Sequence, residues 1–251
     1  MPKNSELNAK ASYGADSIKV LKGLEAVRKR PGMYIGGTDE TAYHHLASEI
    51  LDNSIDEAVA GHAKVISVKL INKNTITISD DGRGIPIDKH PRKKKTALEV
   101  VMTSLHSGGK FNNNIYKSSA GLHGVGLSVV NALSSKLNIR ITKNTKIFNQ
   151  DYSKGKILNK LKLIGKNKIK NGTQITFTPD PEIFGKELSF NPEKIYELSK
   201  NKAYLQKGVK INWECNRNLL NRKSQIPFKE TLSFPKGLEE FLTNEIKQSN
   251  A

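Results

Sequence analysis

The sequence predicts one α+β domain, with helices before, between and after strands of antiparallel type. Three observations predict it. Residues 43–61 carry apolar side chains at helical spacing, residues 64–80 contain two alternating strand patterns, and residues 135–180 contain several more. At 36% hydrophobic and 26% charged residues, the composition is that of an ordinary globular protein.

Composition also excludes several classes of protein. No apolar run approaches the roughly 20 residues that a membrane span needs, and the first residues lack the apolar core of a signal peptide. The single cysteine, Cys215, excludes an intramolecular disulfide and any metal site built from cysteines. We therefore expect a cytoplasmic protein with no membrane partner.

The chain is expected to begin with a flexible, polar arm over residues 1–16. Ser17 can cap a helix that runs to about Arg30, and Pro31 with Gly32 ends it. No repeat or clean linker follows.

The helix predicted over residues 43–61 has an unusual polar face. His45, Glu49, Asn53 and Asp56 follow one another at steps of four, four and three residues, and no Lys or Arg occurs from Tyr43 through His62. A carboxylate beside an imidazole suits general-base chemistry, and an amide oxygen suits a hard cation. An acidic, solvated surface helix is the alternative.

Two strands are predicted next, over residues 64–71 and 75–80. Alternation places Asp80 on the same side as Ile76 and Ile78, so this carboxylate needs a hydrogen-bond donor. The loop that follows reads Asp-Gly-Arg-Gly-Ile-Pro, and its glycines allow the backbone to approach a ligand closely.

After a helix over residues 96–106, a long polar segment ends in the glycine-rich stretch 121–126 and leads directly into a helix. Free N–H groups at a helix N-terminus favour phosphate, although glycines there also serve as plain turns. Further strands are expected between residues 135 and 180, a helix over 191–206, a last strand over 208–213 and a short helix over 237–246.

Several common sites are absent from the sequence. There is no P-loop motif and no strand-following dinucleotide fingerprint, no calcium loop of EF-hand spacing, and no serine nucleophile elbow. The remaining groups form one hypothesis: Asp80 accepts an exocyclic amine such as that of adenine, the 121–126 loop holds phosphates, and Asn53 holds Mg²⁺. Glu49 then activates a water, and His45 orients Glu49.

These stretches resemble the N-terminal ATPase domain of bacterial type II topoisomerase B subunits, which are the B subunits of gyrase and of topoisomerase IV. The matching text is VLKGLEAVRKRPGMYIG, HHLASEILDNSIDEAVAGHA, DDGRGIP, LHSGGKF and AGLHGVGLSVVNALS. The resemblance is dense over residues 17–180. It implies the GHKL (Bergerat) ATPase fold, a two-layer α/β sandwich with helices on one face of a mixed, mainly antiparallel sheet.

The resemblance also implies roles for individual residues. Glu49 matches the general base, His45 its orienting partner, Asn53 the Mg²⁺ ligand and Asp80 the adenine-binding carboxylate, whose contact a water and Thr173 complete. The other residues that the resemblance places at the nucleotide are Tyr13, Glu57, Arg83, Gly84, Ile85, Pro86, Lys110, Tyr116, Gly121, Leu122, His123, Gly124, Val125 and Gly126.

By this resemblance, residues 17–230 form the ATP-binding domain, and residues 231–251 begin the connection to a transducer domain that the chain lacks. The chain is therefore expected to be a fragment that binds ATP and Mg²⁺ but hydrolyses ATP weakly alone. The implied partners are a second B subunit upon ATP binding, an A-type topoisomerase subunit, and DNA. Topoisomerase IV is favoured over gyrase by YIGGTDE, KAYLQKGVKI and FPKGLEEFL.

Two departures and one alternative function remain. Ala120 stands where the family typically has a glycine, and Lys143 stands where gyrase commonly has the arginine that aminocoumarins engage, which puts drug sensitivity in doubt. The net charge of +17, with eleven Lys or Arg and one Asp from Lys136 to Lys170, is also compatible with a basic nucleic-acid-binding module without catalysis.

Overall fold

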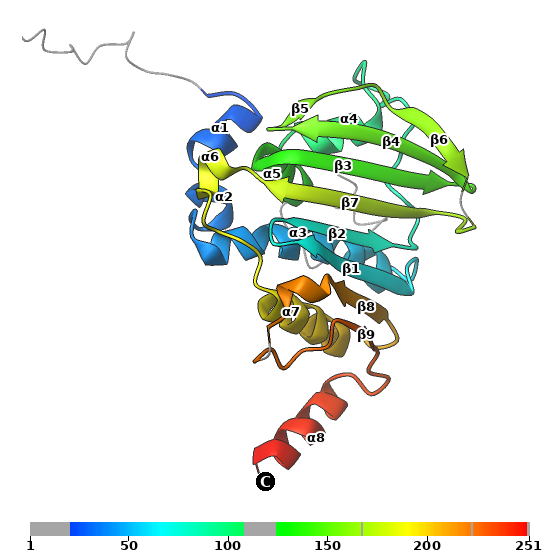
Figure 1. Ribbon diagram of the computed structural model, residues 1–251. Helices are drawn as coiled ribbons and strands as arrows, with labels where there is room; N and C mark the ends of the chain where they lie inside the picture. Colours follow the sequence, from blue (N-terminus) through cyan, green and yellow to red (C-terminus); the bar gives the residue numbers. More distant parts are fainter. Residues whose placement is uncertain (1–20, 108–123, 167, 222, 250–251) are drawn as a thin grey trace, which may run out of the picture.

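The computed structural model describes residues 21–107, 124–166, 168–221 and 223–249, and helices pack against one face of a nine-stranded sheet (Figure 1). The strands are β1 Val65–Asn72, β2 Thr75–Asp80, β3 Ser134–Lys143, β4 Lys146–Ser153, β5 Lys156–Ile157, β6 Lys162–Lys166, β7 Gly172–Pro179, β8 Lys210–Cys215 and β9 Lys229–Leu232. The helices are α1 Leu24–Lys29, α2 Gly32–Ile35, α3 Glu40–Val59, α4 Ala97–Thr103, α5 Gly126–Ala132, α6 Pro181–Phe184, α7 Pro192–Leu205 and α8 Leu238–Ser249, with the 3₁₀ turn η3 Arg217–Leu219.

The sheet is mixed and mainly antiparallel. Its strand order is β5-β4-β3-β7-β2-β1-β8-β9, with β6 also paired to β4. Only the β1–β8 pair is parallel; the other described pairs are antiparallel. The predicted fold class is thus confirmed, and the two sheet edges are formed by β5 with β6 and by β9.

The core lies between the sheet and the helices α3, α4 and α5, which stand behind the strands in Figure 1. Alternate residues of the strands form the sheet side of this core. Ile76 of β2 pairs with Phe177 of β7, and Phe177 also pairs with Leu137 of β3. All three side chains are buried. Because alternate residues point to opposite faces, the intervening polar residues form a second face, which no helix of the described residues covers (Figure 1). We call it the open face.

Helix α3 is the element around which this core is built. Asp39 caps it by accepting a hydrogen bond from the Ala42 N–H at 2.9 Å. Its apolar stripe is buried against β1, β2 and β7, and its flanks contact α5 and α7. The same packing holds its polar face over the end of β2, where Asp80 lies.

The start of the first helix differs from the prediction. The first helix begins at Leu24, because Gly23 has φ +56° and stands outside a right-handed helix. The expected cap at Ser17 lies outside the described residues. Helix α1 ends at Lys29, just before Pro31, as predicted, and Pro31 is the N-cap of the four-residue helix α2.

The sheet also differs from the prediction at both edges. Within the strands expected between residues 135 and 180, the stretch 156–166 divides into β5 and β6 because the Asn159 amide bonds Asp151 twice. Its oxygen accepts from the Asp151 N–H at 3.0 Å, and its nitrogen donates to the carboxylate at 2.5 Å. Strand β8 was expected to be the last, but β9 pairs with it. Among the described residues, no helix combines the length and apolarity needed to span a membrane.

Candidate functional site

The candidate site follows α3 from Glu49 to Glu57, a distance of about 12 Å along the helix axis. Three contacts connect this part of α3 to the glycine-rich segments. Glu49 meets the start of α5, Ser54 meets the end of β2, and Glu57 meets the loop after β2. Helix packing therefore brings together three stretches that are separate in the sequence.

The Glu49 carboxylate is held from two sides. His45 Nε2 lies 3.1 Å from Glu49 Oε1, one helical turn away. This hydrogen bond is the main reason that the pKa of His45 is raised above its usual value. The other oxygen, Oε2, lies against Gly126 so closely that a Cβ at this position would overlap it. One oxygen is thus oriented by the imidazole, and the other faces the point where the glycine loop enters α5.

Asn53 lies one turn after Glu49, and its amide is oriented by the helix itself. The side-chain nitrogen donates to the Glu49 carbonyl at 2.6 Å. The amide oxygen is the kind of hard donor that Mg²⁺ prefers. Among the described residues no cluster of three or more His, Cys, Asp or Glu side chains can hold a metal.

Asp80 ends β2 on the core side of the sheet, as alternation predicts. It accepts hydrogen bonds from the Gly82 N–H at 3.0 Å and from Ser54 Oγ at 3.1 Å. In the sheet register Asp80 pairs with Thr173, whose backbone bonds to its carboxylate. Burial nevertheless dominates and raises the pKa of Asp80 to about 7, with a smaller contribution from the charge of Glu57.

Arg83 and Glu57 form a two-pronged ion pair at the loop after β2. The distances are 3.1 Å from Arg83 Nε to Glu57 Oε2 and 2.7 Å from Arg83 Nη2 to Glu57 Oε1, and the Arg83 N–H also donates to Oε2 at 2.9 Å. Gly82 is required for this closeness: a Cβ there would lie 2.9 Å from both Asp80 Oδ1 and Glu57 Oε2. The pair anchors the loop to α3.

The rest of this loop folds back over β3 and β7. Gly84 has φ +71°, and a Cβ on it would lie 3.0 Å from the carbonyls of Thr142 and Gly172. Lys143 Nζ donates to the Arg83 carbonyl at 2.6 Å, and burial lowers the pKa of Lys143. Ile85 packs against the core and Pro86 is exposed.

The structure brings together the predicted residues His45, Glu49, Asn53, Glu57, Asp80, Arg83, Gly84, Thr173 and Gly126, with Gly124 and Val125 directly before α5. The predicted residues Tyr13, Lys110, Tyr116, Gly121, Leu122 and His123 lie outside the described residues.

Sequence reasoning missed Ser54. Its hydroxyl contacts Asp80, yet its side chain is buried within the apolar stripe of α3. A buried polar group needs a partner, so a serine adjoining Asn53 and facing the sheet was a signal that could have identified it.

Comparisons with known proteins agree with this geometry. A model of the "Histidine kinase-, DNA gyrase B-, and HSP90-like ATPase" family matches residues 38–183. The B subunit of DNA topoisomerase 4 from Rickettsia felis is 56% identical over 240 residues, which cover 95% of this chain and 36% of that protein. The B subunit of DNA gyrase from Campylobacter jejuni is 47% identical over 233 residues, 93% of this chain and 29% of that protein. The chain thus spans about a third of the length of these relatives.

A solved structure is similar as well. It is the 43K ATPase domain of Thermus thermophilus gyrase B in complex with an aminocoumarin, with a TM-score of 0.75 and 41% identity. The match covers 89% of this chain and 55% of that one.

Proposed function

The chain belongs to the family of histidine kinase-, DNA gyrase B- and HSP90-like ATPases, and from this premise we propose that it is the ATP-binding and ATP-hydrolysing domain of a type II DNA topoisomerase B subunit. One observation carries the proposal. The Glu49 carboxylate is oriented by His45 on one oxygen and turns the other toward Gly126, which begins α5. A general base is thereby held beside the segment suited to phosphate.

In the proposed reaction Asp80 accepts a hydrogen bond from the exocyclic amine of adenine, while the backbone of residues 121–126 binds the phosphates. Glu49 takes a proton from a water whose oxygen attacks the γ-phosphorus. The bond between this phosphorus and the bridging oxygen then breaks, which yields ADP and inorganic phosphate. Positioning and charge neutralisation provide most of the catalysis in such a transfer.

We propose Asn53 as the protein ligand of a Mg²⁺ ion that arrives with ATP. The groups around Asn53 support this role, because its amide oxygen is a hard ligand. It lies one helical turn from the Glu49 carboxylate, which faces the end of the predicted phosphate loop. When bound, the ion would neutralise charge on the phosphates. Lys110, Tyr116, Leu122 and His123 are proposed as further contacts to the nucleotide, and Tyr13 as a contact from the N-terminal arm.

For the whole subunit we propose that ATP-driven dimerisation powers DNA strand passage, with an A-type subunit as partner and the bacterial cytoplasm as location. The chain is 56% identical to the topoisomerase 4 relative and 47% identical to the gyrase relative. This difference favours topoisomerase IV, which decatenates and relaxes DNA, over gyrase, which supercoils it. We assign the nucleotide-binding domain to residues 17–230 and the connection to the transducer domain to residues 231–251; the last strand, β9, extends two residues past this boundary.

Calorimetric titration with a non-hydrolysable ATP analogue, with and without Mg²⁺, tests the proposal. We expect Mg²⁺ to strengthen binding to the unmodified chain. In an Asn53→Ala variant the loss of a hard oxygen ligand should remove most of this gain, about 1–3 kcal/mol or roughly 5–150-fold in affinity. The Mg²⁺-free titration is the internal control. Absence of analogue binding by the unmodified chain would refute the proposal.

A second test uses the contact between Gly126 and Glu49. In Gly126→Ala the new methyl group must displace the carboxylate, so we expect ATP turnover by the complete subunit to fall by roughly 10²-fold, as for a displacement of about 1 Å. Gly165→Ala is the matched control, because a Cβ at Gly165 meets nothing within 4 Å. Equal turnover of the two variants, at equal thermal stability, would contradict the positioning of Glu49.

A further inference from the structure

The sheet edge formed by β5 and β6 carries a concentration of positive charge that the nucleotide site does not use. Seven lysines and no acidic side chain occur between residues 154 and 170. Six of them are exposed, and none of the six forms an ion pair with a carboxylate of the described residues. We call these six the lysine edge: Lys156, Lys160, Lys162, Lys166, Lys168 and Lys170.

The lysine edge lies at the end of the strand order. Strand β6 is exposed along its whole length and, within the described part of the chain, pairs only with β4 (Figure 1). Lys154, by contrast, is neutralised by Glu182 at 2.6 Å. The positive charge of the edge is therefore available to a partner.

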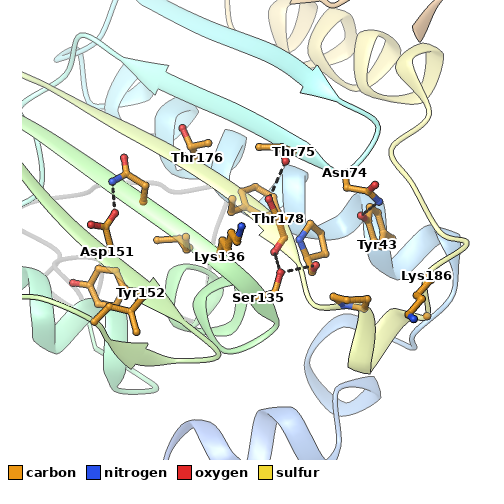
Figure 2. A pocket seen from close by; sticks show the side chains of 17 residues that line it. Tyr43, Asn74, Thr75, Ser135, Lys136, Asp151, Tyr152, Thr176, Thr178 and Lys186 are labelled. Atoms are coloured by element: carbon orange, nitrogen blue, oxygen red, sulfur yellow. Dashed lines mark hydrogen bonds between the residues drawn. The ribbon is translucent and has the colours of Figure 1, made fainter.

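The open face adjoins this edge and offers neutral hydrogen-bonding groups. It has a hollow of about 800 Å³ lined mainly by residues of β3, β4 and β7 and the loop between β1 and β2, with Tyr43 of α3 and residues of α6 and the segment after it at its side (Figure 2). The Thr75 and Thr178 hydroxyls are 2.9 Å apart there, and Lys136 lines the same hollow. The acidic lining residue, Asp151, is hydrogen-bonded by the amides of Asn138 and Asn159.

From these observations we propose that the lysine edge and the adjoining open face bind the phosphate backbone of duplex DNA without regard to sequence. Lys, Thr, Ser and Asn side chains are the groups that contact phosphate and sugar in protein–DNA complexes. A second copy of the lysine edge is disfavoured as occupant of this surface, because it would bring like charges together. The choice of DNA as the polyanion rests on the proposed topoisomerase function.

The position of this surface has a consequence for ATP binding. Asp80 is on the core side of β2, whereas Thr77, three residues earlier, pairs through its hydroxyl with Thr176 at 2.8 Å on the open face. DNA and nucleotide would thus contact opposite faces of one sheet. Both ligands are expected to bind at the same time without competition.

The experiment measures binding of the chain to a fluorescent duplex of about 20 base pairs by anisotropy at several salt concentrations. The edge variant combines Lys160→Gln, Lys162→Gln, Lys166→Gln and Lys168→Gln. We expect it to lose at least about tenfold in affinity near 0.1 M salt, and its slope of log K against log salt to become shallower by about 3–4, since each phosphate contact contributes about 0.9.

The matched control makes the same change in net charge at the opposite sheet edge, with exposed lysines of β8, β9 and the segments beside them: Lys207→Gln, Lys210→Gln, Lys229→Gln and Lys236→Gln. It should weaken DNA binding by less than about threefold and leave the salt slope nearly unchanged. Equal losses in the two variants, or no loss in the edge variant, would overturn the proposal.

Two further measurements separate this proposal from the others. Binding to vesicles of anionic lipid, lost in the edge variant while its DNA binding persists, would assign the surface to a membrane instead. Calorimetric titration with the ATP analogue should give the same affinity for both variants, with or without DNA. If the chain binds the ATP analogue but not DNA, only the proposed DNA-binding surface is overturned. If it does not bind the analogue, the proposed function is refuted.

Discussion

Replacing Glu49 with alanine is expected to slow ATP hydrolysis in the complete protein by about 10²–10⁴-fold, the usual contribution of a general base. Affinity for a non-hydrolysable analogue should change little, because the carboxylate acts on the attacking water and not on the nucleotide. Steady-state turnover and calorimetric titration of the same preparation measure the two effects separately.

Glu40→Ala is the matched control for Glu49→Ala. Glu40 lies on the same helix, in its first turn, and pairs with Lys194 at 2.9 Å on the surface. Removal of such an exposed pair costs little, so turnover should remain that of the unmodified protein. Unchanged turnover in Glu49→Ala itself would rule out the base assignment, and the proton acceptor would have to be sought elsewhere.

Replacing Asp80 with asparagine is expected to weaken analogue binding by roughly 5–150-fold, since a hydrogen bond to a charged acceptor is worth about 1–3 kcal/mol.

The pH dependence of the affinity for the analogue should disappear in Asp80→Asn as well. In the unmodified protein the pKa of Asp80 is about 7, so affinity should fall as the carboxylate is protonated below that pH. Titrations between pH 5.5 and 8 would reveal the difference, with the exposed Asp88→Asn as control. An unaltered affinity in Asp80→Asn would remove Asp80 from the site.

The same variant should stabilise the ligand-free protein at high pH. A carboxyl group with a pKa near 3.8 in the unfolded chain and about 7 in the fold binds more protons when folded between these values. Folding stability contributed by this group therefore decreases as pH rises through this window. Asparagine cannot lose a proton, so at pH 8 we expect a gain on the order of 1 kcal/mol, about 2–4 °C in melting temperature. At pH 4 the gain should vanish; a gain that is equal at both pH values would contradict this explanation.

Much of the site was predictable, because the spacing of residues along the sequence determines which face of a helix or strand each side chain occupies. The helical spacing of His45, Glu49 and Asn53 puts them on one face of α3, as the structure shows. Strand alternation likewise placed Asp80 on the core side of β2. These features depend on the 3.6-residue and two-residue repeats of a regular backbone, which are local properties of the chain.

Other features depended on contacts between distant residues. The division of β5 from β6 follows from bonds between Asn159 and Asp151, and the pairing of β9 follows from a strand 14 or more residues earlier in the chain. Neither leaves a local pattern. Ser54 does leave a local signal, a serine within the apolar stripe of α3, but its partner Asp80 is 26 residues away.

By itself, the sequence determined the fold class, the polar face of α3, the acidic end of β2 and the family. Tertiary structure decided how these groups act on one another. Only packing of α3 against β2 and α5 places Glu49 against Gly126 and buries Asp80 enough to raise its pKa to about 7. Burial and closest approach are properties of the assembled layers, because both arise from atoms that the chain brings together only when it folds.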